Sequence, residues 1–272
     1  MNKIFSLIRV IKKKFTITKI INKFDQDINH HFLPNGYQLE KNVISDLIAM
    51  PKPIFFDDFG MYEHRDIDQS LATVAMEAIS YFNNTIEGYI GNDVRIDDIK
   101  LMWFDPKQAK KISVSGYWHN DQCGNRLKLY ICLKGDGKTP TVYLPNSHTK
   151  KYKFSFWDVL RFVGFKNSKA FVKEKKLRLS SGDCVIFDTN GMHRGMYEEG
   201  SAERVTILVE FIDKNKSNEI SGIAPTGPGN NRTGFINFDK DAYNIFSQSA
   251  LFDTELLKPV DDLFQYSLRY KK

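Results

Sequence analysis

The residues best placed to do chemistry are a histidine and an aspartate two positions apart. His119 and Asp121 stand in the segment YWHND at 117–121. Residues two apart on an extended strand point to the same side, so one imidazole and one carboxylate can bind the same ion. A second histidine from a distant strand would complete the set, and His148 and His193 are the candidates. Two histidines and one carboxylate leave coordination positions open, which suits a non-haem iron(II) that takes a co-substrate and O2 together.

An arginine further along the chain adds a second chemical group. Arg204 lies 11 residues after His193 (204 − 193) and opens the apolar segment 204–212. A guanidinium buried at the end of a strand needs an anionic partner, and its fork of donors matches a carboxylate. We therefore expect Arg204 to bind the distal carboxylate of 2-oxoglutarate. Thr206 shares its face of the strand and would add a hydroxyl.

Several of these assignments have alternatives. Arg204 could instead pair with a neighbouring acid of the protein, Glu203 or Glu210. Lys128 and Tyr130 are alternate residues of one predicted strand, and either would contact the inner end of the co-substrate. Both could equally be ordinary strand residues.

The elements that must position these residues change type along the chain. Residues 1–90 read as mostly helical, and part of that region carries an apolar stripe at steps of three and four. The stripe consists of Leu71, Ala75, Ala78, Phe82 and Ile86. From about residue 98 the pattern changes to short strands separated by turns. The candidate strands are 98–104, 112–119, 127–133, 141–144, 177–179, 183–188 and 204–212.

Many short strands after a helical part predict a mainly β protein with flanking helices (α+β). The expected core, about 98–212, is a double-stranded β-helix, a jelly-roll or cupin-like barrel with helices packed outside. We expect one domain over 25–272, a loop at 225–234 that covers the site, and a closing helix near 254–270.

Composition narrows the class of protein. The chain has 272 residues, 42% of them hydrophobic, and a net charge of +6. Residues 1–24 carry seven basic residues and no acid, so the rest of the chain has a charge of 6 − 7 = −1. A nearly neutral body is not typical of a nucleic-acid binder. The three cysteines lack zinc-finger spacing, which favours a reducing, cytoplasmic setting.

The basic segment 1–24 has apolar residues at helical spacing. It is too short and too interrupted for a membrane-spanning helix or a good signal peptide. One interpretation is an amphipathic helix on an anionic membrane, at the inner membrane surface. The other is a helix packed on the domain with solvated lysines. A second basic segment, 166–176, would hold an anion near the barrel mouth or form a solvated face.

Taken together, these motifs resemble the phytanoyl-CoA dioxygenase-like family of iron(II)/2-oxoglutarate oxygenases. The matching residues are YWHND at 117–121, LPNSH at 144–148, SGD at 181–183, Phe187, His193 and Arg204. The match covers about 119–211, roughly a third of the chain. The resemblance implies a double-stranded β-helix, with His119, Asp121 and His193 as iron ligands and Arg204 on 2-oxoglutarate. It also places His148 in a turn and outside the ligand set.

At two positions this sequence departs from the pattern of the family, and two other residues argue against related classes of enzyme. Asn146 stands where glycine is usual, which is tolerable because asparagine accepts left-handed angles. Gly195 replaces a small hydroxyl residue, which removes one expected hydrogen bond to the co-substrate. The presence of Asp121 disfavours the halogenating variants. Glu210, where alkylation-repair oxygenases have an arginine, disfavours base repair.

The resulting expectation is a hydroxylase that uses Fe(II), 2-oxoglutarate and O2, and releases succinate and CO2. Its substrate would be a small molecule, a lipid or a glycolipid. The alternatives are a cupin-like metalloenzyme that does not use 2-oxoglutarate, a metal-binding barrel without oxidation chemistry, and a membrane adaptor built on residues 1–24.

Overall fold

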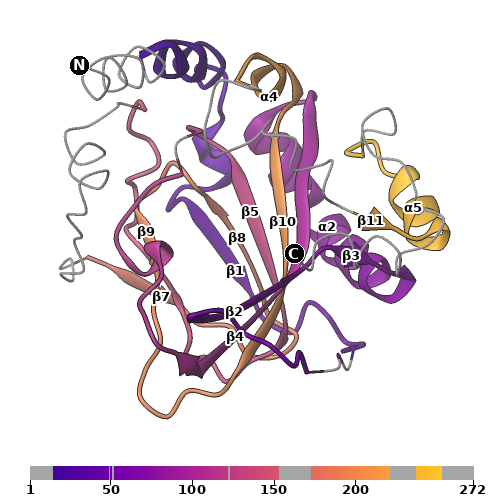
Figure 1. Cartoon of the computed structure of the whole chain (residues 1–272). Coiled ribbons are helices and arrows are strands. Elements are labelled where there is room, and N and C mark those ends of the chain that lie inside the picture. The colour runs from indigo at the N-terminus through magenta and orange to yellow at the C-terminus, as the bar shows by residue number, and fades with distance from the viewer. Residues whose placement is uncertain are drawn as a thin grey trace, which may run out of the picture.

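The computed structural model describes residues 15–48, 50, 52–121, 123–152, 173–220 and 237–252. This part of the chain is mainly antiparallel β-structure with helices on its outside, as predicted (Figure 1). The main sheet has the order β1-β8-β5-β10-β4-β2, and each neighbouring pair is antiparallel. Its strands are β1 Tyr37–Glu40, β2 Phe59–His64, β4 Val94–Ala109, β5 Leu127–Lys134, β8 Cys184–Asp188 and β10 Arg204–Asp213.

A smaller sheet has β6 at its centre. β6 (Thr141–Tyr143) lies between β7 (Lys175–Leu177) and β9 (His193–Gly195), with both pairs antiparallel. A short parallel pair joins β3 (Asp66–Ile67) to β11 (Asn237–Phe238). In Figure 1, β7 and β9 lie on one side of the main sheet, and α2 and α5 lie on the other.

The helices cover the core. They are η1 His30–Phe32, α2 Gln69–Ile90, η2 Val114–Gly116, α4 Lys214–Ile220 and α5 Lys240–Ser247. α2 begins after Asp68, whose side chain accepts a hydrogen bond from the amide of Leu71 and so caps the helix. All five residues of the predicted stripe on α2 are buried, because they face the main sheet. The prediction of this helix is confirmed.

Two predictions about local structure are wrong. The described residues between 15 and 90 are not mostly helical, since β1, β2 and β3 all lie there. The expected strand at 112–119 is instead the turn η2 followed by a single β-bridge at His119. Ile112, the first residue of that range, is 52% exposed and lines a cavity. The strands expected near 98, 127, 141, 183 and 204 are present.

The described part of the basic N-terminal segment is packed on the domain. Residues 15–24 are helical, and Ile17 and Ile21 are buried against Tyr152. Lys23 pairs with Glu219 of α4 at 2.7 Å. This part therefore matches the packed-helix interpretation. In the portion of the chain that can be described, no helix combines the length and apolarity needed to cross a membrane.

Some predictions concern residues outside the described ranges. They are the first half of the N-terminal helix (1–14), the loop at 225–234, the helix at 254–270, and the lysines at 166 and 169.

Candidate metal centre

The backbone brings His119 and His193 side by side. Their amides and carbonyls exchange two hydrogen bonds, at 3.0 Å and 2.8 Å, which join the segment after η2 to the first residue of β9. The amide of Asp121 donates to the carbonyl of Thr189 at 2.9 Å, so the chain stays extended beyond His119. Residues 119 and 121 therefore point to the same side, next to His193, as the H-x-D spacing predicts.

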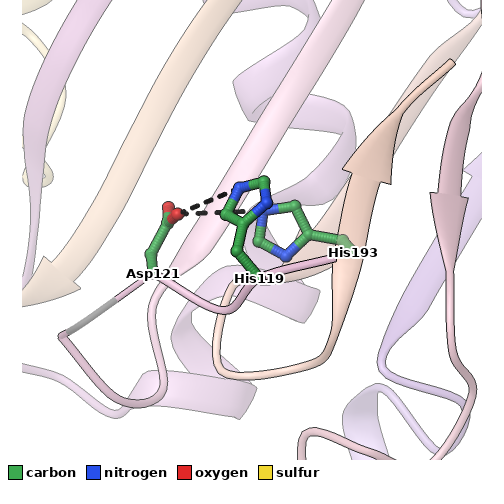
Figure 2. A group of neighbouring side chains, drawn as sticks. All are labelled: His119, Asp121 and His193. Carbon is green, nitrogen blue, oxygen red and sulfur yellow. Dashed lines mark ion pairs between the residues drawn. The ribbon is translucent and has the colours of Figure 1, made fainter. Parts of the chain in front are cut away.

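Both imidazoles are oriented by the backbone. Nδ1 of His119 donates to the carbonyl of Tyr117 at 2.7 Å, and Nδ1 of His193 donates to the carbonyl of Gly191 at 2.8 Å. This fixes the tautomer in each ring and makes Nε2 the nitrogen that could bind a metal. Figure 2 shows both rings turned toward the carboxylate of Asp121.

The three side chains have the geometry of a metal site. Each Nε2 lies 3.8 Å from Oδ1 of Asp121, and the three ligand atoms lie within 4.8 Å of one another. Atoms at these separations leave room for an ion bonded to each at about 2 Å. Within the described residues this is the one group of three such ligands. Two nitrogens and one oxygen on the same side of an ion leave its other positions open, so these residues fit iron(II).

The second oxygen of Asp121 is already bound to protein cations. Oδ2 accepts from Arg126 at 2.5 Å and pairs with Lys128 at 2.6 Å. Arg126 and Lys128 also pair with Glu210, at 2.5 Å and 3.4 Å. The carboxylate is thus held by one oxygen while the other faces the two imidazoles.

Burial and charge set the protonation of this centre. Burial raises the pKa of Asp121, but the charges of Lys128 and Arg126 outweigh it and bring the pKa well below its usual value. Burial, helped by the neighbouring His119, lowers the pKa of His193 to about 3. The two groups therefore stay in the forms that bind metals, an anionic carboxylate and a neutral imidazole, throughout the physiological pH range.

His148 lies elsewhere. It ends the turn after β6, where it is fully buried and its ring meets that of His30 edge-on, with the centroids 5.2 Å apart. Asn146 in the same turn has a φ of 64°, the left-handed conformation expected there. The structure therefore does not bring His148 to His119 and Asp121.

A cavity of about 460 Å³ extends from the two histidines. Its walls come from β2, β4, β5 and β10 of the main sheet and from β6 and β9 of the smaller sheet. Arg204, Tyr130 and Lys128 all line it. Two of the three candidate metal ligands and three of the four expected co-substrate residues therefore line one space between the two sheets.

Arg204 has no acidic partner among the described residues. Its guanidinium donates to the carbonyl of Thr139 and lies 6.0 Å from the centre of the Tyr130 ring. The two acids considered as alternatives are bound elsewhere. Glu203 accepts from Trp103 at 2.7 Å and pairs with lysines, and Glu210 pairs with Arg126 and Lys128.

Thr206 is buried on the same strand as Arg204. Its register places it between Cys132 of β5 and Met102 of β4, on the face that Arg204 shares. Its hydroxyl is buried without a hydrogen-bond partner. A buried polar atom of this kind is costly unless something satisfies it. Thr206 is not among the residues that line the cavity, so its role toward the co-substrate stays a prediction.

The sequence reasoning missed Arg126. It precedes β5 by one residue, and its side chain is 2% exposed. Its position five residues after Asp121 is no recognised spacing, and an arginine beside a strand is usually a surface residue. Only the folded sheet, which places Glu210 next to β5, shows that Arg126 bridges the two acids.

No model of a protein family matches this chain, and no match was found among curated proteins. Solved structures are similar at low identity. The non-haem alpha-ketoglutarate-dependent epimerase SnoN from nogalamycin biosynthesis has 14% identity and a TM-score of 0.46, over 71% of this chain and 83% of that one. HygX from Streptomyces hygroscopicus, with nickel and 2-oxoglutarate bound, has 10% identity and a TM-score of 0.48, over 70% and 87%. The carbocyclase SnoK has 13% identity and a TM-score of 0.43, over 70% and 86%. All three TM-scores are below 0.5.

Proposed function

We propose that this chain is an iron(II)- and 2-oxoglutarate-dependent dioxygenase of the phytanoyl-CoA dioxygenase-like type. We further propose that it hydroxylates a C–H bond of a small-molecule substrate. One observation carries the proposal. A single cavity is lined by the two histidines of a histidine–aspartate–histidine set and by an arginine without an acidic partner among the described residues.

The proposed roles follow from this arrangement. His119, Asp121 and His193 would hold the iron, and Arg204 with Thr206 would hold the distal carboxylate of 2-oxoglutarate. Tyr130 lies between these groups, since its ring contacts both Phe187 beside His193 and the guanidinium of Arg204. Iron and 2-oxoglutarate would supply the oxidising chemistry, with O2 consumed and succinate and CO2 released.

The two sheets are, in this proposal, the two halves of a double-stranded β-helix over about 98–212, with 25–272 as one oxygenase domain. The cavity between them supports it, because its walls come from both sheets. The strand that carries Arg204 and the strand that carries His193 face each other across this space.

The wall on the β2 and β4 side suits a small substrate with a substantial apolar part. Phe59, Met61, Met102 and Phe104 line it. Its cation Lys100 pairs with Glu63 at 2.8 Å, so that charge is already balanced by the protein. Apolar walls also exclude water from the reacting centre. Contact with a membrane through residues 1–24, and a lipid-linked substrate, stay predictions.

Succinate formation tests the proposed function. Iron(II)-loaded protein should convert 2-oxoglutarate to succinate in air, and Arg204→Ala should stop this while iron stays bound. A cupin-like enzyme that does not use 2-oxoglutarate predicts no succinate from either protein. Absence of succinate from folded, iron-loaded protein, with a panel of apolar small molecules present, would contradict the proposal.

A further inference from the structure

Arg126 and Lys128 both pair with Asp121, but only Lys128 lines the cavity. Arg126 is buried behind the metal centre and bridges Asp121 and Glu210, with one nitrogen on each. Lys128 contacts the same two acids but lines the cavity. A lysine is a point charge on a flexible stem, whereas the planar guanidinium is fixed by its two acids. Of the two cations, Lys128 is therefore the one that can turn toward a ligand.

The charges around the metal centre already cancel. Asp121 and Glu210 contribute two negative charges, and Arg126 and Lys128 contribute two positive charges, all in contact. A divalent ion next to this group gains little net attraction and must compete with Lys128 for the charge of Asp121.

A dianion changes this balance. It would neutralise a divalent ion, and it would offer Lys128 a new partner inside the cavity. Resting on the proposed function, we propose that Lys128 couples the binding of the metal to the binding of the dicarboxylate. It weakens metal binding while it pairs with Asp121, and it moves to the dicarboxylate when both ligands are present. Each ligand must then strengthen the binding of the other by the same factor.

Calorimetric titration of the full chain with Mn(II), with and without saturating 2-oxoglutarate, tests this role. The unmodified protein should bind Mn(II) about tenfold or more tightly with 2-oxoglutarate present. Lys128→Met should bind Mn(II) alone about tenfold more tightly than the unmodified protein, because the competing charge is gone. In that variant, 2-oxoglutarate should add less than about threefold.

Three further variants complete the test. Lys128→Arg keeps the charge, but the two acids would fix its guanidinium, so it should bind Mn(II) alone as weakly as the unmodified protein and lose most of the coupling. Lys134→Met removes an exposed lysine of the same strand, which pairs with Glu203 away from the cavity lining, so it should behave like the unmodified protein. Lys128→Gln is a second neutral variant and should reproduce Lys128→Met. Circular dichroism establishes which variants are folded.

The outcomes separate the two proposals. If the unmodified protein forms succinate and shows coupling, and a folded neutral variant at 128 keeps that coupling or binds Mn(II) no more tightly, the role of Lys128 is wrong and the function stands. If 2-oxoglutarate has no effect on Mn(II) binding by the unmodified protein, and no succinate forms, both are wrong.

Discussion

The two ends of strand β10 present opposite electrostatic situations in one cavity. At one end, Glu210 belongs to a buried group in which each acid contacts two cations. At the other end, Arg204 contacts a carbonyl and an aromatic ring and has no acid among the described residues. We call the Glu210 end the completed end, because its acids and cations are already paired, and the Arg204 end the incomplete end. The completed end can hold a ligand atom of a metal in place, and the incomplete end can bind an anion that enters the cavity. In the proposed function, this difference places the metal at the Glu210 end and the co-substrate at the Arg204 end.

The largest expected effect concerns the completed end. His193→Ala should weaken Fe(II) binding by at least about a thousandfold, since a few ligands share about 10–16 kcal/mol in strong metal sites. His148→Ala is the matched control and should keep the metal, because that ring lies in the turn beside His30. Anaerobic equilibrium dialysis measures both. Loss of iron from His148→Ala with retention in His193→Ala would reverse the ligand assignment.

Breaking the buried charge group should cost stability. Arg126→Met leaves Glu210 and Asp121 sharing the single cation Lys128, and removal of one partner from a buried ion pair typically costs about 3–5 kcal/mol. Urea unfolding of the metal-free protein gives this value. Arg178→Met removes an arginine that pairs with Glu198 on the surface and should cost less than about 1 kcal/mol. If both variants lost the same unfolding free energy, the buried ion pairs of Arg126 would contribute no more to stability than a surface ion pair.

Removing the charge at the incomplete end should affect the co-substrate alone. Arg204→Ala should weaken 2-oxoglutarate binding to the iron-loaded protein by about 100-fold, within the 2–5 kcal/mol typical of a lost buried charge partner. Iron binding should change little, since Arg204 contacts none of the three proposed ligands. Anaerobic calorimetry measures both affinities. If Arg204→Ala instead lost iron and kept its affinity for 2-oxoglutarate, the two ends would not have the separate roles proposed here.

The expected effect that is smallest per pH unit compares Asp121 with a buried aspartate that contacts no cation among the described residues. Burial raises the pKa of Asp188 to about 7, although Tyr89, Asn125 and Asn190 donate hydrogen bonds to it. Between pH 4 and 7 the folded protein therefore keeps a proton that the unfolded chain has lost, and this group makes stability fall as pH rises.

Asp188→Asn removes that dependence. The unfolding free energy of the variant should rise relative to the unmodified protein from pH 4 to 7, by at most about 1.4 kcal/mol per pH unit. Urea unfolding at several pH values shows the slope. A difference between the two proteins that does not change with pH would mean that Asp188 is charged throughout.

The strands that the sequence predicted well are continuous apolar runs. Residues 127–133 and 204–212 form the centre of the main sheet and are mostly buried, so their pattern is strong. β1 was missed because its four residues are only half-buried and pair with β8, about 150 residues later in the chain. A short strand of mixed polarity depends on its partner, which local pattern does not reveal.

The sequence predicted those parts of the candidate site in which the spacing of residues along a strand determines where their side chains point. The H-x-D spacing places His119 and Asp121 on one side, and Arg204 opens an apolar strand. Arg126 was not predictable, because its role depends on cross-strand contact with Glu210. Because Glu210 pairs with Arg126, it is not the partner of Arg204. The sequence alone could not decide between these two pairings.

Anaerobic titration of the iron(II)-loaded protein with 2-oxoglutarate tests the central claim most directly. If the metal and Arg204 ends act on one co-substrate, a weak visible charge-transfer band should appear and saturate. The same titration of Arg204→Ala should need about 100-fold more 2-oxoglutarate. A folded protein that holds iron but develops no band at any 2-oxoglutarate concentration would contradict the assignment of this cavity.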